Sequence, residues 1–181
     1  MYHLNCLQHI SCRFILILLV LTAGLVRPVC SDTINVPADQ PTIQAALTAA
    51  QTGDLIILAD GTYSGSGNCD VDPAGKNVII QSASGPANCI IDCQNSSRGF
   101  YIHSGETSAF QIVGIRFING YHFDGGGAIF ITSSSHPVIS NCEFINCSAQ
   151  YYGGGIYVRS NSNPMISNSV FQGNTSTYGG G

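Results

Sequence analysis

The sequence predicts an all-β fold, a right-handed parallel β-helix with one short capping α-helix at its N-terminal side. Three observations lead to this prediction. The second half of the chain repeats with a 27-residue period, polar and glycine-rich turns separate short apolar runs, and one amphipathic helical pattern precedes them. Of the 181 residues, 44% are apolar and only 9% are charged, so a sizeable core can form.

Residues 1–31 are predicted to be a secretory signal. Arg13 precedes an apolar run at 14–26, which has the length of a signal-peptide core, and small residues stand before Asp32. An uncleaved anchor helix is the alternative, but Arg27 and Pro28 end the run early. A lipoprotein signal is weaker still, because the same two residues do not suit the position before Cys30. We therefore expect a secreted or cell-surface protein, associated with the outer membrane, with no membrane span in the mature chain.

The charge balance disfavours nucleic acid as a partner. Beyond residue 31 the chain keeps all ten acidic residues and only four basic ones, a net charge of −6. No basic run is present, and nucleic-acid surfaces need clustered positive charge.

Five cysteines follow the predicted signal, and export permits disulfides. Because five is odd, at least one thiol is expected to be free or to have its partner elsewhere. Cys89 and Cys93 on one extended strand lie roughly 13 Å apart, too far for a bond within that strand. The spacing does not suggest zinc, so structural or free cysteines are expected.

Residues 32–53 are predicted to form a cap. A short strand spans 33–36, and Pro41 opens a helix with Asp39 or Gln40 as its N-cap. Gly53 ends the helix. Four apolar residues form one stripe along it: Ile43, Ala46, Leu47 and Ala50. Such a helix covers the open end of a stack of strands, where exposed edges invite aggregation.

Residues 54–181 are predicted to form four to five turns of the β-helix, here called rungs. In a 27-residue register Phe117, Phe144 and Phe171 coincide, and they are expected to stack as an interior ladder. Arg116 falls under Glu143, which predicts an ion pair between rungs. A unit this short cannot bury its own apolar face, so it must stack on its neighbours.

Glycine triplets begin at Gly125, Gly153 and Gly179, with spacings of 28 and then 26, which suggests insertions or deletions between them. A phosphate-binding loop is disfavoured because no lysine follows and each of the first two triplets leads into a strand. We interpret them as tight turns with positive φ and little room for side chains. The chain ends inside a repeat unit, so we expect it to be the front part of a longer protein.

The segment "TIQAALTAAQTGDLIILADGTY" resembles the cap and first rung of pectin-lyase-like β-helix proteins. The later units, with "GGAI" at 126–129 and "FQGN" at 171–174, resemble the repeats of polymorphic outer membrane proteins. The units "GGGIY", "FINC" and "FING" depart from that pattern. The resemblance implies the β-helix fold, and enzymes of this fold act on acidic polysaccharides through clustered acids with arginine or lysine.

No catalytic residue is assigned from the sequence, because the acids are scattered along the chain. Only Asp70 and Asp72 lie close together, roughly 7 Å apart on one strand face. They are weak calcium candidates, with a solvated turn as the alternative, and no arginine or lysine aligns with them. The histidines are interpreted as surface or turn residues, and no other cofactor is expected.

Aromatic residues stand just before each glycine triplet. Tyr121, Tyr151, Tyr152 and Tyr178 are candidates for contact with a glycan or a protein, and turn packing is the alternative. Two functions follow as hypotheses. The first is an adhesive, structural or glycan-binding β-helix whose partner is a polysaccharide or a surface protein. The second is a carbohydrate-active enzyme of the pectin-lyase-like fold, a lyase, hydrolase or esterase, whose catalytic residues lie partly outside this fragment.

Overall fold

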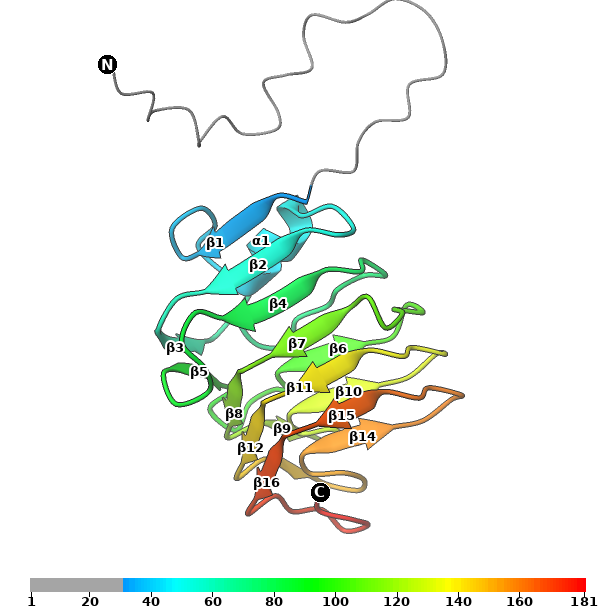
Figure 1. Cartoon of the computed structure of the whole chain (residues 1–181). Coiled ribbons are helices and arrows are strands. Elements are labelled where there is room, and N and C mark those ends of the chain that lie inside the picture. Colours follow the sequence, from blue (N-terminus) through cyan, green and yellow to red (C-terminus); the bar gives the residue numbers. More distant parts are fainter. Residues whose placement is uncertain (1–30) are drawn as a thin grey trace, which may run out of the picture.

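The computed structural model describes residues 31–181, and the predicted signal falls outside them, apart from its last residue. The described chain is a parallel β-helix of about four turns, stacked from the cap down to the C-terminal end (Figure 1). All strand pairings within the sheets are parallel. The predicted all-β fold is therefore confirmed.

Each full rung contributes strands to three main sheets and, in the later rungs, to a fourth short one. The first sheet contains β1 (Thr33–Val36), β2 (Leu55–Leu58), β4 (Ile79–Ser82), β7 (Gln111–Val113), β11 (Val138–Ser140) and β15 (Met165–Ser167). The second contains β3 (Gly61–Ser64), β5 (Cys89–Asp92), β8 (Arg116–Ile118), β12 (Glu143–Ile145) and β16 (Val170–Gln172). The third contains β6 (Phe100–Ile102), β10 (Ile129–Ile131) and β14 (Ile156–Val158), and the short one β9 (Tyr121–His122) and β13 (Ser148–Ala149).

The core consists of columns of identical or similar side chains that run along the stack. In the first sheet, Ile56, Ile80, Ile112 and Ile139 are register partners, and all four are fully buried. The residues on either side of each isoleucine point the other way, as the two-residue period of a strand requires. Each rung therefore buries its apolar face on the rungs above and below.

The predicted phenylalanine ladder is present. Phe117 stacks on Phe144 with ring centroids 5.2 Å apart, and Phe144 stacks on Phe171 at 4.7 Å. Phe117 and Phe144 are buried, whereas Phe171 on β16 is 40% exposed. The predicted pair of Arg116 and Glu143 is also present, with Nε and Oε2 2.6 Å apart.

The cap helix α1 spans Ile43–Ala49, so it begins two residues later than Pro41 predicts and ends at the C-cap Ala50, before Gly53. Thr42 is the N-cap, and its hydroxyl accepts a hydrogen bond from the Ala45 amide, so neither Asp39 nor Gln40 has that role. The predicted apolar stripe is confirmed, because all four of its residues are buried. At the carboxyl end, Lys76 Nζ donates to three carbonyl oxygens, those of Leu47, Thr48 and Ala50. A rung residue thus holds the cap in place.

The corners of the rungs use left-handed backbone. Asn119, Asn146 and Gly173 follow the 27-residue period, and their φ angles are 52°, 53° and 65°. Asparagine and glycine adopt this conformation at the lowest cost. The asparagine repeats in the sequence therefore mark corners.

The glycine triplets form turns, as predicted, but their register differs from the expected one. Gly125 pairs with Tyr152, so Gly126 aligns with Gly153 and the 27-residue period continues unbroken between these two turns. Only one residue is lost later, because Tyr152 pairs with Tyr178. Gly126 and Gly153 have φ of 66° and 50°. A Cβ on Gly127 would lie 2.3 Å from the Gly154 oxygen, so close backbone approach also requires glycine here.

Candidate functional site

The third sheet carries an aromatic ladder on its outer face. Tyr101, Phe130 and Tyr157 are register partners on β6, β10 and β14, and neighbouring ring centroids are 5.4 and 5.3 Å apart. We call these three residues the outer ladder. They were not predicted from the sequence, although Phe130 and Tyr157 are one 27-residue period apart and carry the same repeat signal as the inner phenylalanines.

Two arginines cover the outer ladder. The Arg98 guanidinium lies 4.7 Å from the Tyr101 ring centroid, and that of Arg159 lies 4.9 Å from the Phe130 centroid. Both distances are within the range of cation–π contact. Phe130 is consequently only 3% exposed although it faces outward.

Next to the outer ladder lies a patch of exposed aromatic side chains, which we call the aromatic strip. It contains Phe123, Tyr151, Tyr152 and Tyr178. Tyr152 stacks on Tyr157 of the outer ladder at 5.1 Å and contacts both Tyr151 and Tyr178. Phe123 meets Tyr151 edge to face at 5.1 Å.

The strip belongs to loops that stack one rung on the next. Tyr152 pairs with Gly125 on one side and with Tyr178 on the other. The Tyr178 amide also donates to the Tyr151 carbonyl at 2.7 Å. The glycine turns therefore fix the spacing of the exposed rings, which gives the strip a rigid backbone.

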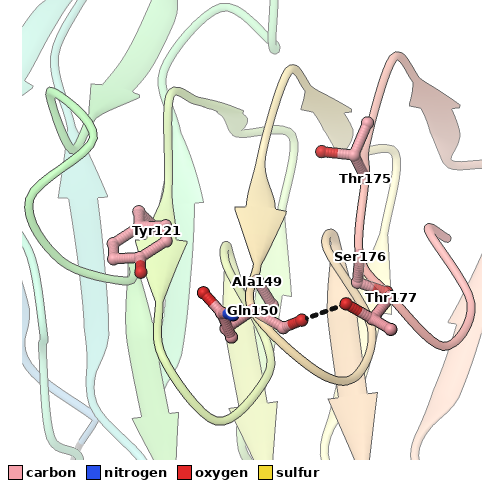
Figure 2. Close-up of a pocket in the computed structure, with 6 residues that line it drawn as sticks. All are labelled: Tyr121, Ala149, Gln150, Thr175, Ser176 and Thr177. Atoms are coloured by element: carbon pink, nitrogen blue, oxygen red, sulfur yellow. Dashed lines mark hydrogen bonds between the residues drawn. The ribbon is translucent and has the colours of Figure 1, made fainter.

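A shallow hollow of about 330 Å³ lies beside these loops, and we call it the side hollow (Figure 2). Its volume is at the lower end of the range for ligand pockets. Thr177 Oγ1 donates to the Gln150 carbonyl across it at 2.5 Å. None of its lining side chains is charged. They are Tyr121, Ala149, Gln150, Thr175, Ser176 and Thr177.

The structure thus brings three of the four predicted contact residues together. Tyr151, Tyr152 and Tyr178 lie on the aromatic strip, with exposed fractions of 38%, 44% and 61%. Tyr121 lies on β9 and lines the side hollow, where Gln150 leads directly into the strip. Exposure to this extent argues against turn packing as their sole role.

A charged cluster lies beyond the outer ladder, around Arg98. This side chain is 8% exposed; its Nε lies 3.1 Å from Asp70 Oδ1, and its Nη2 contacts His122 Nε2. Burial lowers the pKa of Arg98, and the carboxylates of Asp70 and Asp124 oppose that shift. Burial, together with the positive charge of Arg98, lowers the pKa of His122. His122 is therefore held neutral beside a buried cation.

In the structure, each predicted calcium candidate lies next to a basic side chain. Asp70 pairs with Arg98, and Asp72 Oδ2 lies 3.2 Å from His103 Nε2, whose ring stacks on Tyr101. The expectation that no arginine aligns with these acids is wrong, because a strand-to-strand turn brings Arg98 under Asp70. Within residues 31–181, no three acidic, histidine or cysteine side chains gather as a metal site. Calcium binding at this pair stays a prediction.

A further charged group near this face, Glu106, is used in buried polar contacts. Glu106 is fully buried, and its carboxylate accepts from the amides of Gly75 and Ser104 and from the Ser135 hydroxyl. It ties three rungs together and is inaccessible to a substrate. Two buried nitrogens of Arg98, Nε and Nη1, have no hydrogen-bond partner within the described chain, although Nε lies in ion-pair distance of Asp70.

Fold and surface together define a right-handed parallel β-helix protein with an aromatic outer face. The chain belongs to the family described as "Right handed beta helix region", whose profile matches residues 56–181. No curated protein and no solved structure matches it. Across residues 31–181, the only helix is too short to cross a membrane. The likeness to polymorphic outer membrane proteins stays a prediction.

Proposed function

We propose that this protein is a secreted or cell-surface β-helix that binds glycans through the aromatic strip and the side hollow. The observation that carries the proposal is the contiguous, exposed set of Phe123, Tyr151, Tyr152 and Tyr178 on rigid stacked loops. Isolated exposed apolar side chains are ordinary, but a clustered set marks an interaction surface.

Aromatic rings suit sugars because the C–H faces of a pyranose pack against the face of a ring. Tyrosine also contributes a hydroxyl that pairs with sugar hydroxyls while the ring stays rigid. Since each ring of the strip packs against a neighbouring ring, its rotational freedom is already restricted and less side-chain entropy is lost on binding. An extended glycan chain fits a strip that runs across three successive rungs.

The side hollow supplies polar groups of the matching kind. The Thr175 hydroxyl and the Gln150 side-chain amide offer donors and acceptors without charge. The Ser176 and Thr177 hydroxyls, which already donate to backbone carbonyls, offer acceptors. The described chain is also acidic overall, which disfavours polyanionic partners. We therefore favour a neutral glycan.

Export and display at the cell surface are part of this proposal. They are supported by the apolar run at 14–26, the small residues before Asp32 and the low charge of the chain.

The test compares the wild-type chain with Tyr151→Ala/Tyr152→Ala in affinity electrophoresis through gels that contain soluble neutral polysaccharides. We expect at least one neutral glycan to retard the wild type, and the double variant to lose about 10-fold or more in affinity, because two stacking rings are removed. Met165→Ala, another exposed apolar residue on β15, is the matched control and should bind as the wild type does. Equal retardation of all three chains, or no retardation by any glycan, contradicts the proposal.

An enzyme of the pectin-lyase-like fold is the second candidate, favoured by the partly exposed pair of Asp72 and His103 beside Asp70. A carboxylate that orients a histidine is a common general-base arrangement. Release of unsaturated or reducing ends from polygalacturonate and other glycans, with and without calcium, tests it. Turnover by the wild type that is lost in Asp72→Asn would favour this candidate.

A further inference from the structure

Two thiols from adjacent rungs meet near the cap. Strand β3 pairs with β5 so that Ser64 lies opposite Asp92, and a short loop at 65–68 then returns the chain to Cys69. The Cys69 thiol donates a hydrogen bond to the Asp92 carbonyl oxygen, with 3.5 Å between sulfur and oxygen, and this places Cys69 beside Cys93, the residue that follows Asp92. Cys93 is buried, whereas Cys69 is partly exposed.

We propose that Cys69 and Cys93 are a redox-active pair that forms a disulfide between the two rungs. The Cys69 sulfur comes within hydrogen-bond distance of the peptide group that joins Asp92 to Cys93, and a disulfide needs Cα atoms about 4.4–6.8 Å apart. The pairing uses two of the five cysteines that follow residue 31 and leaves three as thiols, which accounts for the odd number.

The other cysteines in the described chain are placed less favourably for a disulfide. Cys89 and Cys142 lie on β5 and next to β12, with β8 between those strands, so about 9.6 Å separates their rungs. The Cys147 thiol lies against the carbonyl oxygens of Phe117 and Ile145, also beyond the rung of Cys93. Cys69 and Cys93 come from adjacent rungs, whereas an intervening rung separates Cys89 from Cys142 and Cys93 from Cys147.

The chemistry proceeds by thiol–disulfide exchange with a small disulfide such as oxidised glutathione. The Cys69 thiolate attacks one glutathione sulfur, the S–S bond breaks, and the first glutathione leaves as a thiolate. Cys93 then loses its proton to solvent and attacks the Cys69 sulfur, which releases the second glutathione. Both cysteines are oxidised, and one oxidised glutathione is reduced to two thiols.

The two thiols differ in a way that suits this order. Contact with the Cys93 S–H lowers the pKa of Cys69, while the same contact and burial raise that of Cys93. The partly exposed Cys69 is thus the thiol that a reagent reaches first. Cys93 lies in position to resolve the mixed disulfide.

The bond would fasten the cap to the body of the β-helix. The loop before Cys69 contacts the start of α1, because the Gln44 amide donates to the Gly67 oxygen and the Ile43 amide to Asn68 Oδ1. The residue after Cys69 is Asp70, the partner of Arg98. Closing a loop of about 25 residues should therefore stabilise both the cap and the first rungs.

The test is a disulfide map of the full-length protein after incubation with oxidised glutathione and alkylation of free thiols. Cleavage before aspartate places Cys69 in a fragment of residues 60–69, Cys89 in 72–91 and Cys93 in 92–123, so each thiol is identified without a variant. We expect fragment 60–69 linked to fragment 92–123, separable by reduction. Full alkylation of Cys69 and Cys93, or a link to another fragment, overturns the proposal.

Thermal unfolding offers a second measurement. The melting temperature of the oxidised protein should exceed that of the reduced protein by roughly 5 °C. Cys69→Ser should remove this difference, whereas Cys89→Ser, which changes a buried thiol outside the pair, should retain it. A Cys89→Ser variant that also loses the difference would contradict the assignment.

Discussion

The two aromatic ladders of this β-helix follow the same repeat but lie in different surroundings. The inner ladder of Phe117, Phe144 and Phe171 fills the space between the sheets, while the outer ladder of Tyr101, Phe130 and Tyr157 faces away from it. In both, stacked rings lie in register at similar distances. The difference lies in what surrounds them: apolar core on one side, and arginines, tyrosines and solvent on the other.

The comparison teaches that a stacked repeat does not by itself indicate burial. Parallel stacking places any repeated residue over its copy, whichever face it occupies. The strand alternation decides the face, and the neighbouring loops then decide whether the rings are covered or available to a ligand.

The largest expected effect is in the inner ladder. Phe144→Ala removes a fully buried ring between two others, and we expect a loss of about 3–5 kcal/mol in the free energy of unfolding. Chemical denaturation monitored by circular dichroism measures it. Phe171→Ala is the matched control, and its loss should be about half as large because Phe171 is already partly exposed. Equal losses would show that burial does not determine how much each ring of the ladder contributes to the free energy of unfolding.

The outer ladder should respond less. Phe130→Ala removes a ring that is covered from outside by the long side chains of Arg98 and Arg159, so we expect a loss of about 1–3 kcal/mol in the free energy of unfolding, since these side chains can fill part of the vacated space. The same denaturation experiment applies. A loss as large as that of Phe144→Ala would mean that the outer ladder is a second core.

The repeat also decides which features of the structure can be predicted from the sequence. The repeat placed Phe117 over Phe144 and Arg116 over Glu143 correctly, because residues one period apart must stack. The cap stripe was also predictable, since the spacing of Ile43, Ala46 and Leu47 is characteristic of a helix with one buried face.

Other features could not be predicted because they join segments whose spacing differs from the repeat period. Arg98 meets Asp70 and His122 in the early rungs, where the repeat is irregular. Cys69 reaches Cys93 only because a loop shifts the register of its rung. The N-cap was not predicted because the fixed φ of Pro41 suits the first turn of a helix and indicates an earlier start. Thr42 is the N-cap because its hydroxyl accepts a hydrogen bond from the Ala45 amide.

The charged cluster beside the outer ladder predicts a pH dependence. The pKa of His122 is lowered by burial and by Arg98, against opposing effects from Asp124 and Asp70. A histidine with a folded pKa below its unfolded value of about 6.5 remains neutral in the folded state while the unfolded chain takes up a proton. Stability should therefore fall as the pH drops below about 6.5, and level off once the folded form also protonates.

Urea denaturation between pH 7.5 and 5 measures this dependence, and His122→Gln should flatten it over that window. The effect should be smaller than that of Phe130→Ala, because His122 is only half-buried. A slope that persists unchanged in the variant would assign the dependence to another group and would contradict this prediction.

The smallest effect is expected for the ion pair of Arg116 and Glu143, which lies on the outward face of the strands that carry the inner ladder. Arg116 and Glu143 precede Phe117 and Phe144, so the ion pair and the ring stack share one register but face opposite ways. Because both charged side chains are partly exposed, water screens them, and the pair should contribute only about 0.2–1 kcal/mol. A double-mutant cycle with Arg116→Met and Glu143→Gln measures the coupling, which should shrink further in roughly 1 M salt. A coupling above about 2 kcal/mol that resists salt would show that the outer face contributes to stability as the core does, and the contrast between the two faces would then fail.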